Sequence, residues 1–266
     1  MTTVSTERDY PQMAATRGRI EPAPRRVRGY LGHELVFDTT AARYVWEVPY
    51  YPQYYVPLAD VRAEFLRDED HPQRVQLGPS RLYSLVGDGQ TYPSAARVFD
   101  AEGPGVEGPV AGTVRFEWNP LRWFEEDEPI YGHPRNPYSR VDALRSHRHV
   151  RVELDGVVLA DTRSPVLLFE TGLPTRYYID PTDVAFEHLE PSPTQTLCPY
   201  KGVTSGYWSV RVGSAGNQAL HPDLAWTYHY PLPAVGQIAG LVAFYNEKLD
   251  IVVDGLALAR PQTQFS

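Results

Sequence analysis

An internal repeat constrains the fold of this chain more than any other feature. Residues 27–64 align with residues 150–187 without a gap, at an offset of 123 positions, and 11 of the 38 aligned positions are identical. Farther along, residues 110–112 and Phe116 correspond to residues 238–240 and Phe244. Agreement over an ungapped stretch indicates a duplication, so we expect two tandem domains of one fold. The identical pairs are Val27/Val150, Arg28/Arg151, Leu31/Leu154, Asp38/Asp161, Thr39/Thr162, Glu47/Glu170, Tyr54/Tyr177, Tyr55/Tyr178, Asp60/Asp183, Val61/Val184 and Glu64/Glu187.

The periodicity of the second copy is that of β-strands. Residues 150–154 alternate between apolar and polar side chains, Asp155-Gly156 is a hairpin-turn dipeptide, and an apolar run returns over 157–160. No segment sustains a long helical stripe, and residues 181–189 predict at most a short helical turn. We therefore predict a mainly β fold with short strands in both halves. Further strands are expected over 166–170, 176–179, 207–212, 225–228, 241–245 and 249–253.

Changes in amino-acid composition along the chain predict the domain boundaries. Residues 1–24 hold arginines among Thr, Ala and Pro, which favours a flexible N-terminal arm. The first repeat is expected over 25–135 and the second over 149–260. Between them, the polar run from Asn136 to His149 is predicted to contain the boundary.

The net charge and the composition limit the kinds of molecule that the chain is expected to bind. The net charge of −8 and pI near 5.5 argue against nucleic-acid binding. No apolar stretch reaches the ~18 residues of a membrane helix, and no signal-peptide core follows the N-terminus. The single cysteine cannot form an internal disulfide. We therefore expect a cytoplasmic protein with no membrane partner, and the duplication leaves a homo-oligomer open.

Several short motifs in the second copy resemble a known family. The clearest is Cys198-Pro199-Tyr200-Lys201-Gly202 followed by residues 207–210, Tyr-Trp-Ser-Val. Supporting motifs lie at 170–178, 225–228, 238–240 and 244–245. Together they resemble the bacterial family called domain of unknown function 427, whereas the first copy matches weakly and reads as degenerate. The resemblance implies a β fold similar to the tent-shaped domain of methionine sulfoxide reductase B and the Mss4-like proteins, and it implies no established activity.

Cys198 and Lys201 are the candidate catalytic residues. Cys198 is the only cysteine, and Lys201 is one of two lysines among 25 basic residues. A nearby ammonium group favours the nucleophilic thiolate form of a cysteine. Pro199 and Gly202 would shape a turn that directs both side chains into one pocket. The other interpretation is a buried, inert cysteine beside a surface lysine.

The candidate substrate-binding residues lie around this motif. Glu170 and Arg176 flank a turn and could bind a polar or anionic molecule or pair with each other. Glu170 corresponds to Glu47, whereas Arg176 corresponds to Gln53, so Arg176 belongs to what distinguishes the second copy. Aromatic side chains could line a pocket, although most should pack in the core. The aromatic candidates are Tyr177, Tyr200, Trp208, Trp226 and Tyr228.

These residues leave three functions open. The chain could be an enzyme for a small polar or anionic molecule that uses Cys198, Lys201 and Arg176, a non-catalytic small-molecule-binding module, or a structural scaffold. We assign no metal ligands, because the chain has no Cys-x-x-Cys pair and its histidines lack zinc-site spacing. No cofactor can be named. Around 77–85 the first copy has neither cysteine nor lysine and a shorter loop, so its pocket, if any, would differ.

Overall fold

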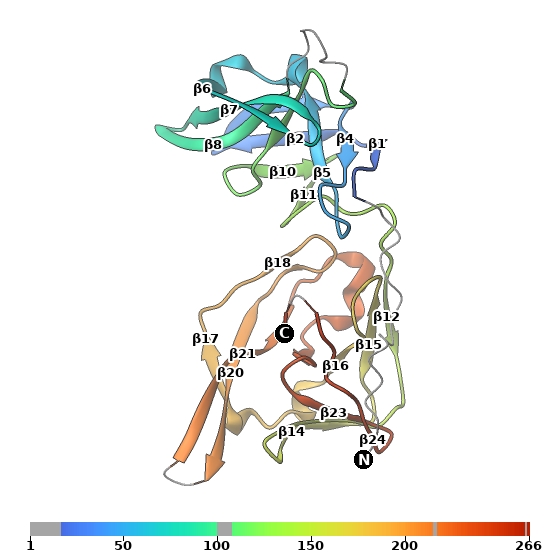
Figure 1. Ribbon diagram of the computed structural model, residues 1–266. Helices are drawn as coiled ribbons and strands as arrows, with labels where there is room; N and C mark the ends of the chain where they lie inside the picture. Colours follow the sequence, from blue (N-terminus) through green and yellow to red (C-terminus); the bar gives the residue numbers. More distant parts are fainter. Residues whose placement is uncertain (1–16, 100–107, 215–216, 264) are drawn as a thin grey trace. The chain divides into compact units, whose positions relative to one another are not determined.

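A computed structural model describes residues 17–99, 108–214, 217–263 and 265–266 of the chain (Figure 1). The chain forms two compact units, and the division falls between Pro137 and Tyr138. Each unit consists of antiparallel sheets with a few short 3-10 helices. The prediction of two tandem, mainly β domains is therefore confirmed. The finer likeness to the tent-shaped domain stays a prediction.

The first repeat is built from two sheets. Its seven-stranded sheet has the order β1-β4-β5-β9-β8-β7-β6, and its four-stranded sheet has the order β11-β10-β2-β3. Two 3-10 turns, η1 and η2, follow β5 in the chain. The elements are β1 (Ile20–Pro22), β2 (Val27–Leu31), β3 (Glu34–Thr39), β4 (Arg43–Val45), β5 (Gln53–Pro57), η1 (Leu58–Asp60), η2 (Ala63–Phe65), β6 (Leu66–Val75), β7 (Gly78–Gly87), β8 (Gln90–Phe99), β9 (Thr113–Phe116), β10 (Arg122–Glu125) and β11 (Glu128–Ile130).

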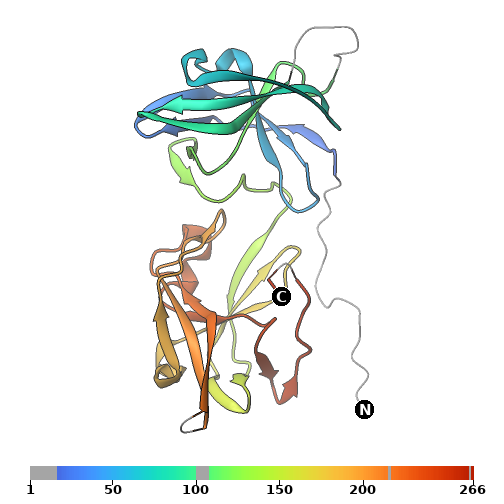
Figure 2. The same cartoon turned by 60° about the vertical axis from the view of Figure 1, so that its left-hand side comes forward.

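The second repeat also has a seven-stranded and a four-stranded sheet. Their orders are β12-β15-β16-β22-β21-β20-β17 and β14-β13-β23-β24. In Figures 1 and 2, β20 and β21 project as a long orange hairpin. The elements are β12 (Val141–Arg145), β13 (Val150–Leu154), β14 (Val157–Thr162), β15 (Val166–Glu170), β16 (Arg176–Ile179), η3 (Pro181–Asp183), η4 (Phe186–His188), β17 (Leu189–Ser192), β18 (Leu197–Cys198), β19 (Gly202–Val203), β20 (Gly206–Ser214), β21 (Asn217–Thr227), η5 (Pro233–Ile238), β22 (Val242–Phe244), β23 (Asp250–Val253) and β24 (Leu256–Ala257).

The two repeats match strand for strand. In the large sheets, β1-β4-β5-β9-β8-β7-β6 corresponds to β12-β15-β16-β22-β21-β20-β17. In the small sheets, β11-β10-β2-β3 corresponds to β24-β23-β13-β14. One difference stands out. The first repeat joins β6 to β7 through Gln76 and Leu77 alone, whereas the second places the extra two-stranded hairpin β18–β19 between β17 and β20.

Each face of the large sheet in the second repeat is covered by apolar side chains. One face packs against the small sheet, with Val150, Leu159, Ile179 and Phe244 among its buried residues. The opposite face carries a second cluster that includes Tyr178, Tyr207 and Trp226, together with Val235 and Ile238 from η5. This second face also carries several of the functional candidates described below, among them Trp226 and Tyr228.

Several local predictions can be compared with the structure. The flexible arm predicted over 1–24 is too long, because residues 20–22 form β1 and pair with β4, whereas residues 1–16 lie outside the described residues. The polar run predicted as a boundary holds β12, which pairs with β15, so the second repeat starts before residue 149. Asp155 and Gly156 do form the hairpin turn, with φ of 50° and 79°. The short helical turn over 181–189 is two 3-10 turns, η3 and η4.

Candidate functional site

The Cys-Pro-Tyr-Lys-Gly motif forms the turn of the extra hairpin. Cys198 pairs with Gly202 across β18 and β19, so the intervening three residues make the loop. Gly202 has a φ of +97°, which residues with a Cβ rarely adopt. A second anchor holds the base of the hairpin, where the backbone N–H of Thr196 donates to the Oγ1 of Thr204 over 2.8 Å. The local sequence thus fixes a tight, anchored turn.

Lys201 points inward from this turn and forms an ion pair with Glu170 at the end of β15. The Lys201 and Glu170 side chains are only 12% and 10% exposed. Burial by itself lowers the pKa of Lys201, but the acidic groups of Cys198, Glu170, Tyr178 and Tyr228 together raise it well above its ordinary value. Lys201 is therefore a buried cation at neutral pH.

Two tyrosines complete the surroundings of Lys201. Tyr178 on β16 and Tyr228 just after β21 are both buried and close enough to interact electrostatically with the ammonium group and with Cys198. Burial raises the pKa of Tyr178 to about 12, with Lys201 opposing the rise. The indole N–H of Trp226 donates to the Tyr178 hydroxyl over 3.3 Å. We call Cys198, Lys201, Glu170, Tyr178 and Tyr228 the hairpin cluster.

Arg176 lies on the same face of the sheet but has its own partner. Its guanidinium donates two parallel hydrogen bonds to the carboxylate of Glu247, of 2.6 and 2.7 Å. A third, of 3.2 Å, reaches the Oδ1 of Asn246. The side chains of Arg176 and Glu247 are 8% and 0% exposed, so this is a buried ion pair. The guanidinium carbon also lies 5.6–6.0 Å from the ring centroids of Trp226, Tyr245 and Phe265.

The strand register explains which aromatic side chains share this face. Tyr178 pairs with Ala243, which pairs with Trp226, which pairs with Tyr207, and directly paired residues project to the same side. Arg176, two residues before Tyr178, projects there too. Trp226 therefore lies between the Arg176 pair and the hairpin cluster, in contact with both.

Two of the predicted binding residues lie on the other face. Trp208 follows Tyr207 directly and packs against the core between the sheets, with its ring 5.7 Å from that of Phe186. Tyr177 belongs to that same core. Because successive residues of a strand alternate between faces, neither shares the surroundings of Lys201. Tyr200 is half-buried in the turn of the hairpin, and Cys198 is also partly exposed.

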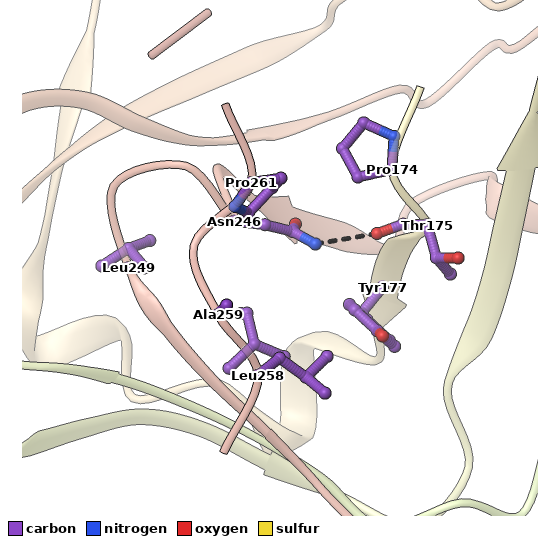
Figure 3. Close-up of a pocket in the computed structure, with 9 residues that line it drawn as sticks. Pro174, Thr175, Tyr177, Asn246, Leu249, Leu258, Ala259 and Pro261 are labelled. Carbon is purple, nitrogen blue, oxygen red and sulfur yellow. Dashed lines mark hydrogen bonds between the residues drawn. The ribbon is translucent and has the colours of Figure 1, made fainter. Parts of the chain in front are cut away.

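Tyr177 instead lines a small cavity in the second repeat. This cavity, of about 50 Å³, lies between β16 and the C-terminal segment, and Figure 3 shows Leu249, Leu258 and Pro261 around it. The side-chain amide of Asn246 donates to the backbone carbonyl of Thr175 at its edge, over 2.8 Å. The cavity is too small for a metabolite, and its lining does not include Lys201 or Cys198.

Sequence reasoning missed three residues that the structure brings to this face. Glu247 and Asn246 hold Arg176, and Tyr178 replaces Tyr177 beside Lys201. Side chains alternate between the two faces of a strand, and Tyr178 lies two residues after Arg176 on β16. This alternation could have placed Tyr178 on the same face as Arg176 from the sequence. No sequence signal joined Arg176 to Glu247, which lies 71 positions away.

The described residues offer neither a metal site nor a membrane-spanning helix. Within the part of the chain that the structure describes, no three His, Cys, Asp or Glu side chains gather in a way that could hold a metal ion. No helix among the described residues is long and apolar enough to cross a membrane.

Comparison with known proteins identifies the family. The family model described as domain of unknown function (DUF427) matches twice, over residues 19–126 and 142–255. No curated protein matches the chain in sequence. The two matches cover most of the chain and coincide with the two repeats of matching strand order. The chain therefore belongs to the domain of unknown function 427 family, of which it carries two tandem copies.

Proposed function

We propose that the second repeat acts on a small polar molecule at the hairpin cluster, with Cys198 as the nucleophile. The observation that carries the proposal is the buried ammonium group of Lys201 beside the only thiol of the chain. Both belong to a hairpin that the first repeat does not have. A neighbouring cation stabilises the negative charge through which the sulfur reacts as a nucleophile.

The cluster suits addition of sulfur to a carbonyl carbon. The thiol gives its proton to water, the thiolate electron pair forms the sulfur–carbon bond, and the carbonyl electron pair moves to oxygen. The Lys201 ammonium and the Tyr228 hydroxyl would stabilise that oxygen. Glu170 positions Lys201, while Tyr200 at the rim would contact the rest of the molecule.

Arg176 has a supporting role in this proposal. Its guanidinium is held by Glu247 and Asn246 and lies against the ring of Trp226. Trp226 in turn donates to the Tyr178 hydroxyl of the hairpin cluster. We infer that Arg176 positions Trp226 and does not bind the substrate itself.

A non-catalytic binding module is the second candidate, and one observation favours it. Lys201 and Arg176 both already hold carboxylate partners inside the protein, so neither charge needs a ligand. In this reading the polar groups at the rim of the hairpin recognise a small molecule without any covalent step.

Alkylation of Cys198 by iodoacetamide near neutral pH separates the two functions. In the folded protein we expect saturating, single-site modification, in which the sulfur–carbon bond replaces the carbon–iodine bond and iodide leaves. Lys201→Met should slow it several-fold because the favourable charge is lost. Glu170→Gln should speed it, since the ammonium then has one fewer compensating charge. Lys248→Met, which changes the exposed second lysine, is the matched control and should leave the rate unchanged.

Circular dichroism checks that each variant is folded. Lys201→Met leaves Glu170 without its ion-pair partner, and this loss could unfold the repeat. In that case the faster alkylation expected for Glu170→Gln still tests whether the charge of Lys201 controls the reaction of Cys198. A rate that responds to neither variant would favour the binding module. Native mass spectrometry of the freshly purified protein would then identify a retained molecule.

A further inference from the structure

The first repeat has a larger cavity than the one described above. It has a volume of about 290 Å³ and lies on the large sheet, at the face that matches the hairpin-cluster face of the second repeat. This is near the lower limit of cavities that hold small ligands. Its lining includes Trp46, Glu47, Tyr55, Arg97, Phe99 and Arg115.

The cavity also contains Arg97, whose hydrogen-bond partners among the described residues are neutral. Its guanidinium donates to the side-chain oxygens of Gln73, over 2.8 Å, and of Ser80, over 3.2 Å, both of which are neutral. Among the residues that the structure describes, no carboxylate lies within ion-pair distance of Arg97. A partly buried arginine without a counter-ion is a ready site for a carboxylate or phosphate group.

The neighbouring arginine is already neutralised. Arg115 contacts Glu47 over 3.2 Å and also pairs with Glu117, and the hydroxyl of Tyr55 donates to Glu47 over 2.9 Å. The two glutamates of the cavity are thus occupied by Arg115 and Tyr55. Among the described residues, by contrast, the charge of Arg97 has no carboxylate partner.

The fold itself does not require these arginines. Arg97 pairs with Arg115 across β8 and β9, and the matching pair on β21 and β22 is Trp226 and Ala243. The same sheet therefore forms with an indole and a methyl group at these positions. Because the fold forms without this partly buried arginine pair, stabilising the fold does not account for it. Binding of a ligand does.

We propose that the first repeat binds a small planar organic anion in this cavity. Its carboxylate or phosphate group lies on Arg97, and its ring packs against Val75 and Leu77, the partly exposed apolar side chains of the lining. The site is separate from the hairpin cluster, so its test does not depend on the function proposed for the second repeat.

Calorimetric titration of the full chain with benzoate and with phenyl phosphate tests the proposal. We expect saturable, one-to-one binding of at least one of them, and the tighter binder tells a carboxylate ligand from a phosphate ligand. Benzyl alcohol, which has the ring without the charge, should bind far more weakly. Arg97→Met should weaken binding roughly 30-fold or more, because it removes the charged partner.

The matched control is Arg67→Met, which changes an exposed arginine on β6 outside the cavity and should leave affinity unchanged. Arg97→Lys is a second variant in case Arg97→Met does not fold. It keeps the positive charge but loses the paired hydrogen bonds, so it should bind the anion with intermediate affinity. The proposal is overturned if neither anion binds at millimolar concentration, if benzyl alcohol binds equally well, or if folded Arg97→Met and Arg97→Lys bind as the unaltered chain does.

Discussion

The two repeats place a glutamate at equivalent sequence positions, two residues after β4 in the first repeat and at the end of β15 in the second, and neutralise it from different elements. Glu47 in the first repeat pairs with Arg115, which lies on the adjoining part of the sheet. Glu170 in the second pairs with Lys201, which comes from the extra hairpin. The position of Arg115 is taken by Ala243 in the second repeat, and this small residue is fully buried. The duplication thus kept the acid and changed the source of its cation.

That difference shows how one scaffold can present two kinds of site. In the first repeat the cation is part of the sheet, and a cavity of about 290 Å³ with a second arginine lies beside it. In the second repeat the cation arrives with a loop that also brings the thiol of Cys198. The strand order is common to both, so the chemistry resides in side chains and one insertion.

The strongest test of this comparison is the buried Arg176–Glu247 pair, which the first repeat replaces with Gln53. Arg176→Met should cost about 3–5 kcal/mol of stability, because Glu247 is left buried without its partner. Gln53→Met, the matched change, should cost less than about 1 kcal/mol. Hydrogen exchange of the full chain, read separately over β5 and β16, measures both.

The double variant Arg176→Met/Glu247→Leu provides the control, since removing both charges should recover most of the loss. A small effect of Arg176→Met would mean that the pair does not distinguish the energetics of the two repeats.

A second test exchanges core volumes between the repeats. Gly29 faces Phe37 across β2 and β3, and the matching residues are Val152 and Ala160. A Cβ on Gly29 would lie 2.2 Å from the Phe37 ring, so Gly29→Val should cost about 1–3 kcal/mol by overpacking. Adding Phe37→Ala, which recreates the pair of the second repeat, should relieve the clash. Denaturant unfolding measures the stability of the single variants and of the double variant. If the stability losses of Gly29→Val and Phe37→Ala simply add in the double variant, the two substitutions do not compensate for each other.

These examples show what the sequence could and could not predict. Ungapped alignment and strand periodicity were sufficient for the repeat and for its β class, because both depend on local pattern. The motif at 198–202 predicted the proximity of Cys198 and Lys201, because three residues span a hairpin turn. Partners such as Glu247 for Arg176 depend on the packing of distant segments, which no local pattern encodes. The placement of Trp208 on the other face could have been predicted from alternation, had the register of β20 been known.

The smallest expected effect is a pH dependence carried by Glu247. Burial opposes ionisation of this carboxyl, but the hydrogen bonds and charge of Arg176 outweigh it and hold the pKa of Glu247 below its ordinary value. The folded protein therefore binds this proton less readily than the unfolded chain, and the contribution to stability is complete above the ordinary glutamate pKa of about 4.3. It is lost as the pH falls through that value and then through the lower pKa of the folded state.

We therefore expect the stability difference between the unaltered chain and Glu247→Gln to be largest near neutral pH and to shrink on acidification. Denaturant unfolding across that range, followed in the second repeat by hydrogen exchange over β16, measures it. Lys201 does not contribute in this range, because its raised pKa keeps it charged in the folded state and its ordinary value keeps it charged in the unfolded state. Gln53→Glu, which places a carboxyl in the first repeat at the position that corresponds to Arg176, is a control and should not acquire this acid dependence, since it creates no counterpart of the Arg176–Glu247 pair. A stability difference that stays constant with pH would show that the pair leaves the proton affinity of Glu247 unchanged, and the two repeats would then respond to acid alike at these positions.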